Sequence, residues 1–254
     1  MELLRASNLS IGWLAAARTL LGRSRVKAGR EAWDLAVEIS DPADSEVADI
    51  RAGLDAELSR QELQSIDTVA NTIFPQSLWR SSQNRDEFFG RYRQMVPKLK
   101  RFRGNNRGLY FDRLTEWPPA SAEPMNQVEA VIKRLASERQ GRGPLRFVYD
   151  MSVFSPRHDK RPMGFPCLAY LNVKLDGDRL RLTAHYRNHY FVERAYGNYL
   201  GLARLQEFIA GEAGLSVGPL TCISGHAELE PEYARTEFVR WLRHVIEEHE
   251  AECD

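Results

Sequence analysis

The sequence has little cysteine and no long apolar run. Its three cysteines, Cys167, Cys222 and Cys253, are too few for the disulfide framework that stabilises small secreted domains. No stretch approaches the ~20 apolar residues of a membrane-spanning helix. The first residues, 1–21, mix charged with apolar side chains and do not have the layout of a signal peptide. We therefore expect a cytoplasmic protein without a membrane partner.

An excess of either charge is also absent. Lys plus Arg and Asp plus Glu number 35 each among 254 residues, so the formal net charge is zero at pH 7. This balance creates no global field that attracts nucleic acid, and a nucleic-acid partner is not expected. The segment 80–107 is locally basic. We expect a solvated helical face and loop there, with a phosphate- or partner-facing patch as the alternative.

Several familiar catalytic motifs are missing too, namely the P-loop, the glycine-rich dinucleotide motif and the serine nucleophile elbow. No repeat, low-complexity tract or linker divides the chain. The patterning predicts a single α+β domain over 1–254. Helices are predicted at 8–21, 41–58, 61–73, 86–96 (ended by Pro97), 125–138, around 200–214 and at 231–250, and strands at 31–39, 145–153, 167–175, 179–186 and 219–224.

The sequence does contain a predicted β-hairpin with potentially catalytic side chains at its open end. The alternating runs 167–175 and 179–186 flank an Asp-Gly turn, which is a strong hairpin signal. The two strands would bring the Cys167 thiol beside the Arg187 guanidinium. A nearby cation lowers the pKa of a thiol and raises the thiolate fraction. The pair indicates covalent catalysis, and a small buried cysteine in a strand is the alternative.

The stretch from Pro166 to Glu230 resembles thymidylate synthase and the related pyrimidine-nucleotide hydroxymethylases. The family's motifs correspond here to Pro166-Cys167, Arg187-Asn188, Asn198 and the Gly-His-Ala-Glu-Leu-Glu segment at 225–230, in register without a gap. Each motif is weak alone, and the shared register makes the fold assignment specific. The resemblance implies a single-domain thymidylate-synthase-like fold, a mixed sheet flanked by helices, and a homodimer whose sheets pack back to back.

The resemblance also implies a reaction, the methyl or hydroxymethyl transfer to C5 of a pyrimidine nucleotide from 5,10-methylenetetrahydrofolate. Cys167 would add to C6 of the base and so make C5 nucleophilic. Arg187 would bind the nucleotide phosphate and favour the thiolate. Asn198 would read the base, because its amide can match the N3–H and O4 of uracil, whereas cytosine-specific relatives carry Asp there. Capping of the following helix is the alternative role for Asn198.

Weaker matches would complete the phosphate and ribose sites. Arg25 lies in a loop that folds over the phosphate in the family. The family's two adjacent arginines from the partner subunit are separated here, which leaves Arg142 and Arg146 as substitutes. Glu228 and Glu230 stand at the positions of the ribose-binding His and Tyr. They could instead favour the positive N-terminus of the helix expected to follow.

Other positions depart from the family's pattern. Four substitute residues surround the expected site: Leu168 for His, Asn188 for Ser, Tyr190 for the folate-contacting Asp, and His226 for Asp. The segment 65–71 offers Asp67 or Asn71 where the family has a catalytic Glu, and the apolar tail that closes over folate is absent. The altered ribose positions, Glu228 and Glu230, predict an unusual sugar, a ribonucleotide or a modified nucleotide as substrate. The alternative function is a nucleotide-binding or sensing module, or a subunit of a complex, on the same fold.

The remaining histidines and cysteines do not indicate a metal site. His185 and His189 straddle a strand end, which is poor spacing for two ligands on one face. We expect these two and His226 to be hydrogen-bonded or exposed. Cys222 is expected to be structural, and Cys253 to lie in a solvent-exposed tail.

Overall fold

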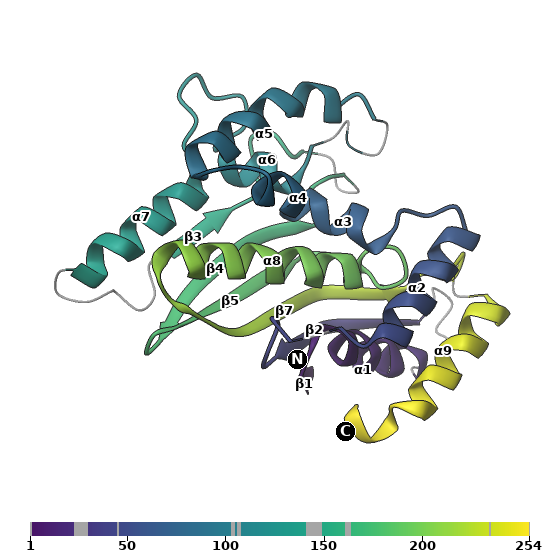
Figure 1. Ribbon diagram of the computed structural model, residues 1–254. Helices are drawn as coiled ribbons and strands as arrows, with labels where there is room; N and C mark the ends of the chain where they lie inside the picture. Colours follow the sequence, from purple (N-terminus) through teal and green to yellow (C-terminus); the bar gives the residue numbers. More distant parts are fainter. Residues whose placement is uncertain are drawn as a thin grey trace.

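The computed structural model describes residues 2–22, 30–44, 46–102, 105, 108–140, 149–160, 164–233 and 235–253. Its centre is one mixed sheet with the strand order β1-β2-β7-β5-β4-β3, and β6 also pairs with β7 (Figure 1). The strands are β1 (Glu2–Ala6), β2 (Arg30–Ile39), β3 (Tyr149–Ser152), β4 (Leu168–Asp176), β5 (Arg179–Tyr186), β6 (His189–Tyr190) and β7 (Ser216–Leu229).

The predicted hairpin is confirmed as β4 and β5. The two strands pair antiparallel from Leu168↔Tyr186 to Asp176↔Arg179. Gly177 in the turn has a φ of 65°, a left-handed conformation that glycine adopts without strain. β5 then pairs in parallel with β7, and β7 pairs antiparallel with β2. The hairpin is therefore fixed inside the sheet, and its open end carries Cys167 and Arg187.

The longest helix, α8, packs along the sheet, and α3 to α6 gather beside it (Figure 1). Helix α8 is buried along almost its whole length. Its C-cap is Gly214, where the sequence predicts the end of the helix. The helices are α1 (Leu9–Gly22), α2 (Ala48–Arg60), α3 (Ile66–Ile73), α4 (Gln76–Arg80), α5 (Arg85–Leu99), α6 (Tyr110–Thr115), α7 (Gln127–Gln140), α8 (Ala195–Ala213) and α9 (Thr236–Glu248).

Two glycines let α3 lie directly on α8. A Cβ atom at Gly197 would stand 2.6 Å from Cβ of Val69, and one at Gly201 would stand 2.7 Å from the carbonyl oxygen of Ala70. Real Cβ atoms do not approach so closely, so only glycine allows this helix separation. Further along the same face of α8, Phe208 packs against Trp79 of α4 at 4.7 Å and against Phe74 and Phe88, from the end of α3 and from α5. Both of these rings also contact Phe111 of α6. These contacts hold α3 and α6 beside the open end of the hairpin.

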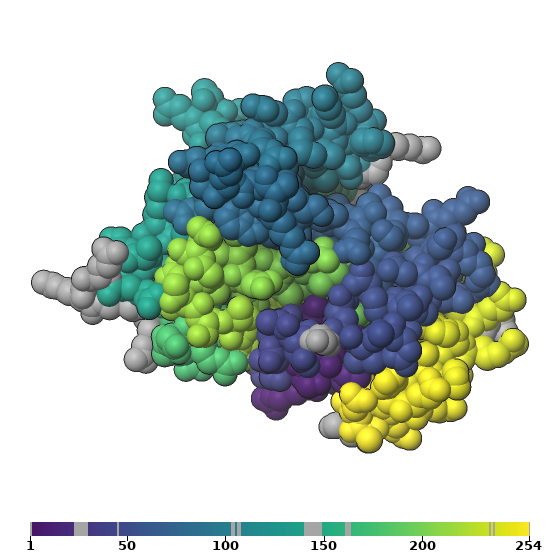
Figure 2. Space-filling view, viewed as in Figure 1, coloured from purple at the N-terminus to yellow at the C-terminus, as the bar shows by residue number. Residues whose placement is uncertain are grey.

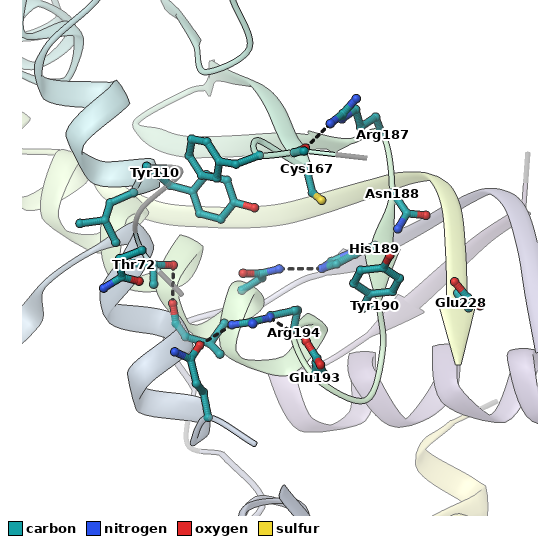
Figure 3. A pocket seen from close by; sticks show the side chains of 18 of the residues that line it. Thr72, Tyr110, Cys167, Arg187, Asn188, His189, Tyr190, Glu193, Arg194 and Glu228 are labelled. Atoms are coloured by element: carbon teal, nitrogen blue, oxygen red, sulfur yellow. Dashed lines mark hydrogen bonds and ion pairs between the residues drawn. The ribbon is translucent and has the colours of Figure 1, made fainter. Parts of the chain in front are cut away.

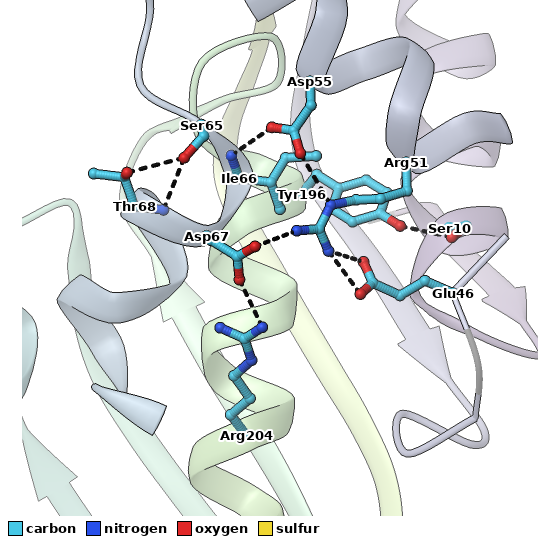
Figure 4. Close-up of polar contacts among 10 residues, drawn as sticks. All are labelled: Ser10, Glu46, Arg51, Asp55, Ser65, Ile66, Asp67, Thr68, Tyr196 and Arg204. Carbon is cyan, nitrogen blue, oxygen red and sulfur yellow. Dashed lines mark hydrogen bonds and ion pairs between the residues drawn. The ribbon is translucent and has the colours of Figure 1, made fainter. Parts of the chain in front are cut away.

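An ion-pair cluster fastens α3 to its neighbours α2 and α8 (Figure 4). Arg51 donates to Glu46 at 2.7 Å, to Asp55 at 3.2 Å and to Asp67 at 2.7 Å. Asp67 also accepts from Arg204 of α8 at 2.7 Å. Burial alone would raise the pKa of Asp67, but the two guanidinium groups lower it. Asp67 is therefore a structural carboxylate that links three helices.

Several predicted boundaries are wrong, each for a local reason. The side chain of Asp41 accepts the Ala43 N–H in a turn, so α2 begins only at Ala48. Pro97 lies inside α5, because near a helix end it removes a single backbone bond and the last turn continues to Leu99. β7 extends well beyond the predicted 219–224. The sequence does not predict the short elements β1, α4, α6 and β6, because each has too few residues to show a hydrophobic periodicity.

The C-terminal helix is shorter and its end more buried than predicted. α9 begins at Thr236 and packs against α2, where Trp241 fills the space beside Gly53. Figure 2 shows this helix, in yellow, against the blue α2 segment. Cys253 is 7% exposed, so the expectation of an exposed tail is wrong. Cys222 is fully buried in the core, as expected. No helix among the described residues is long and apolar enough to cross a membrane.

The close packing of α3 on α8 leads to a stability prediction. A Gly201→Ala variant must push Ala70 and Ile73 away, and overpacking of this kind costs about 1–3 kcal/mol, more than alanine gains in helix propensity. Gly211 lies in the same helix with nothing within 4 Å of its Cβ position, so Gly211→Ala should gain up to about 1 kcal/mol. Urea unfolding of both variants measures the difference. Equal stability of the two would contradict this packing.

Candidate active site

A cavity of about 620 Å³ lies at the open end of the hairpin (Figure 3). Its wall is built by the loop before α3, α3 itself, the start of α6, the ends of β4 and β5, β6, the start of α8 and the last part of β7. The cavity brings together eight of the residues singled out from the sequence: Cys167, Arg187, Asn188, His189, Tyr190, Asn198, His226 and Glu228. Arg25, Arg142 and Arg146 lie outside the described residues.

Arg187 joins the end of β5 to the start of β4. Its backbone N–H donates to the carbonyl oxygen of Cys167 at 3.0 Å, and its Nε donates to that of Pro166 at 2.9 Å. Another guanidinium nitrogen donates to the carbonyl oxygen of Gly164. The guanidinium also lies over the ring of Phe154, 5.9 Å from its centroid. Arg187 therefore holds the segment that carries the thiol, in addition to facing the cavity.

The Cys167 thiol is half-buried between two cations. Burial raises its pKa above the ordinary value, and the guanidinium groups of Arg187 and Arg194 oppose this shift only in part. The direction differs from that expected from Arg187 alone, because the sequence does not reveal how far the hairpin end is covered. In Figure 3 the sulfur and the hydroxyl group of Tyr110 both point into the cavity.

Arg194 is a second cation in the wall that sequence reasoning missed. It occupies the N-cap position of α8 and donates to Gln64 and, at 3.2 Å, to Glu193. Arg194 and Glu193 both line the cavity. The available signal was the position of Arg194 four residues before Asn198, one helical turn away on the same helix face.

Asn198 lies inside α8 and does not cap it. Its backbone N–H donates to the carbonyl oxygen of Arg194 at 2.9 Å as an ordinary helical bond, so the alternative capping role is wrong. Its side-chain Nδ2 lies 3.0 Å from Nε2 of His189. His189 is fully buried, stacks on Tyr186 at 4.0 Å, and reaches Ser224 Oγ with its Nδ1 at 3.0 Å. Burial lowers the pKa of His189 to about 3, so its ring is neutral.

His226 joins the cavity wall to the edge of β2. Its Nδ1 lies 2.5 Å from Oδ1 of Asn188, and its Nε2 lies 2.8 Å from a carboxylate oxygen of Glu31. The exposed ring of Trp33 packs on it at 4.7 Å. Both His189 and His226 are therefore hydrogen-bonded, as expected. Among the described residues, no group of three or more His, Cys, Asp and Glu side chains could hold a metal ion.

The two glutamates at the family's ribose positions have different surroundings. Glu228 lines the cavity, and burial raises its pKa. Glu230 is 2% exposed and is not part of the wall. Its carboxylate accepts the backbone N–H groups of Val192 at 2.8 Å and Glu193 at 3.0 Å. These N–H groups replace the predicted helix N-terminus as partners, because α9 begins only at Thr236. Glu230 thus fixes the loop that leads into α8.

The segment expected to supply an acidic catalyst does not bring one into the cavity. Asp67 is held in the ion-pair cluster of Figure 4, and Asn71 is exposed. The wall residues from this region are Gln64, Val69 and Thr72. The carboxylates that do line the cavity, Glu193 and Glu228, come from other elements. Leu168, which follows the thiol, is fully buried in the core.

The chain is similar to archaeal proteins named "Putative thymidylate synthase". It is 28% identical to one from Methanococcoides burtonii over 120 residues, which cover 47% of this chain and 51% of the relative. It is 31% identical to one from Methanopyrus kandleri over 109 residues, 42% of this chain and 50% of the relative. No family model matches the chain. The matches are consistent with a divergent member of the thymidylate synthase-like family, and the chain spans about half the length of these relatives.

Glu230 gives a pH-dependent stability prediction. Burial raises its pKa from 4.5 to about 7, against the opposing effect of its backbone N–H partners. The folded protein therefore keeps a proton that the unfolded chain releases, so this contribution to stability is present at low pH and is lost as the pH rises from 4.5 to about 7. Glu230→Gln removes this dependence.

Urea unfolding at pH 5 and pH 8 measures the effect. The loss of stability caused by Glu230→Gln should be larger at pH 5 than at pH 8. Glu123→Gln is a suitable control, because Glu123 is exposed. A loss that is the same at both pH values would contradict the proposed protonation of Glu230.

Proposed function

We propose that the chain is a divergent pyrimidine-nucleotide C5 methyl- or hydroxymethyltransferase with Cys167 as nucleophile. The observation that carries the proposal is that one cavity combines this thiol, the guanidinium of Arg187 and the carboxamide of Asn198. Its volume of about 620 Å³ lies within the usual range of small-molecule sites. The thymidylate synthase names of the relatives support the same reaction class.

In the proposed reaction the Cys167 thiolate bonds to C6 of the base and the C5=C6 π electrons move to C5 and O4. The enolate then forms a bond from C5 to the one-carbon unit. Loss of the C5 proton and expulsion of the thiolate restore the double bond. Transfer of the one-carbon unit would break both of its bonds to donor nitrogens, and the product would be completed by water for a hydroxymethyl group, or by a hydride from the reduced folate, which would leave as dihydrofolate, for a methyl group. Arg187 and Arg194 favour the thiolate electrostatically, which offsets part of the effect of burial on its pKa.

The polar wall residues can be assigned to the parts of a nucleotide. Arg187 would bind the phosphate, with Arg25, Arg142 and Arg146 as further candidates. Asn198 would read the base edge. Glu228 would accept hydrogen bonds from sugar hydroxyls, because an ionised carboxylate only accepts. A ribonucleotide, whose sugar has two adjacent hydroxyls, suits such an acceptor.

The one-carbon donor proposed is 5,10-methylenetetrahydrofolate. The ring of Tyr190 and the carboxylate of Glu193 both line the cavity, and they suit the flat face and the N–H groups of a pterin. When bound, this cofactor would supply the one-carbon unit. Asn188 and His226, hydrogen-bonded to each other, would shape the wall beside Arg187.

We also propose a homodimer that uses the sheet face opposite α8. Along β5, buried Leu180, Leu182 and Ala184 alternate with partly exposed Arg181 and Thr183. β7 shows the same alternation. One face is thus covered by helices, and the other is available for a second sheet.

A second candidate is a nucleotide-binding or sensing module without turnover. The raised pKa of Cys167 favours it, because a neutral thiol is a poor nucleophile. The absence of Asp67 and Asn71 from the wall favours it too. The two functions share the binding residues and differ only in whether the thiol reacts.

Tritium release tests the proposed reaction. Uridine and cytidine 5′-monophosphates and their deoxy forms, labelled at C5, are incubated with the protein with and without 5,10-methylenetetrahydrofolate. We expect release from a uracil nucleotide and a loss of about 10³-fold or more in Cys167→Ala. Cys253→Ala, which changes a cysteine outside the cavity, should keep the release. Binding without release would favour the sensing module, and full release by Cys167→Ala would refute the thiol mechanism.

A further inference from the structure

Behind Asn198 three side chains form a buried hydrogen-bonded chain. Ser224 Oγ lies 3.0 Å from Nδ1 of His189, and Nε2 of His189 lies 3.0 Å from Nδ2 of Asn198. The three residues are 1%, 1% and 4% exposed. They come from β7, β6 and α8, which meet only in the folded sheet. Asn198 and His189 both line the cavity, whereas Ser224 does not, and Asn198 is the residue that would read the base in the proposed function.

With Nδ2 of Asn198 facing the ring, the chemistry of these groups sets the tautomer of His189. An amide nitrogen donates and does not accept. Nε2 of His189 must therefore accept from Asn198, which places the ring proton on Nδ1. Nδ1–H then donates to the oxygen of Ser224. The ring is held in place by Tyr186, which stacks on it with an interplanar angle of 2°.

We propose that His189 is a positioning residue that sets base selectivity by fixing which way the Asn198 carboxamide faces. This inference rests on the proposed function, in which Asn198 reads the base edge. Uracil presents a donor at N3 and an acceptor at O4, whereas cytosine presents an acceptor at N3 and a donor at N4. Turning the amide over exchanges its oxygen and nitrogen, and so exchanges the base that it matches.

The two amide orientations correspond to the two neutral tautomers of His189. With the proton on Nδ1, the ring accepts from Nδ2 of Asn198. With the proton on Nε2, the ring would donate to Oδ1, and Ser224 would donate to Nδ1. Ser224 can serve in either arrangement because a hydroxyl both donates and accepts. His189 stays neutral because it is fully buried, so a tautomer change is the available route between the two orientations.

The tautomer can be observed directly, without any nucleotide. Nitrogen-15 NMR of histidine-labelled protein distinguishes Nδ1–H from Nε2–H. We expect Nδ1–H for His189 in the unsubstituted protein. In Asn198→Asp the carboxylate can only accept, so His189 should carry a proton on Nε2. An Nε2–H tautomer in the unsubstituted protein, or no change in Asn198→Asp, would overturn the inference.

The consequence for selectivity is measured as the ratio of dissociation constants for uridine and cytidine 5′-monophosphates. His189→Phe keeps a ring that can stack on Tyr186 but removes both ring nitrogens, so the Asn198 amide is no longer held one way, and we expect the preference for uridine monophosphate to fall about tenfold or more. His189→Gln has an amide oxygen that can still accept from Nδ2 of Asn198 and should keep more of the preference. Tyr199→Phe removes another buried hydroxyl near His189, one that has no hydrogen-bond partner among the described residues, and should leave the ratio unchanged.

The outcomes separate this inference from the proposed function. If both nucleotides bind and His189→Phe leaves the ratio unchanged, the specificity role of His189 is wrong while the nucleotide site stands. If neither nucleotide binds, the proposed function fails and the specificity role falls with it. The NMR result still decides the tautomer in that case.

Discussion

The candidate site depends on one set of hydrogen bonds, which Arg187 donates to the segment at the start of β4. Its backbone and side chain donate to the carbonyl groups of Cys167, Pro166 and Gly164. A guanidinium has five donors in a fixed fork, so a single residue can hold this segment and still face the cavity. These hydrogen bonds fix the position of the thiol. They also fix the point from which the chain continues into β6 and α8. Arg187 is therefore a structural residue as much as a candidate ligand of phosphate.

Burial has a common electrostatic effect around the cavity. It raises the pKa of Cys167, Glu228 and Glu230 and lowers that of His189, so each of these groups is pushed toward its neutral form. An anionic ligand matches the guanidinium groups in the wall. In the proposed reaction the thiolate must form in these surroundings, so the contribution of the two guanidinium groups is needed for chemistry and not only for binding.

The sequence predicted the hairpin and the register of the site better than its electrostatics. Cys167 and Arg187 lie at the open end of the strongly patterned hairpin, where strand pairing brings them together, and Asn198 lies in the first part of the patterned helix α8. Glu230 and Arg194 could not be predicted in this way. The role of Glu230 depends on where α9 begins, and that of Arg194 depends on how the loop before α8 turns. Burial, which sets the direction of the Cys167 pKa, arises from segments distant in sequence that no local pattern connects to the thiol.

The substituted residues in the wall are paired with one another, which bears on whether the cavity still binds a ligand. Asn188 and His226 both stand where the family has other residues, and they hydrogen-bond each other, while Glu31 binds the far side of His226. His226 is partly exposed, with 18% of its side chain accessible, so water could satisfy its nitrogen atoms. Burial therefore does not require these pairs. A wall whose polar side chains hold one another in place is preorganised for a ligand, which favours a rebuilt binding site over a decayed one.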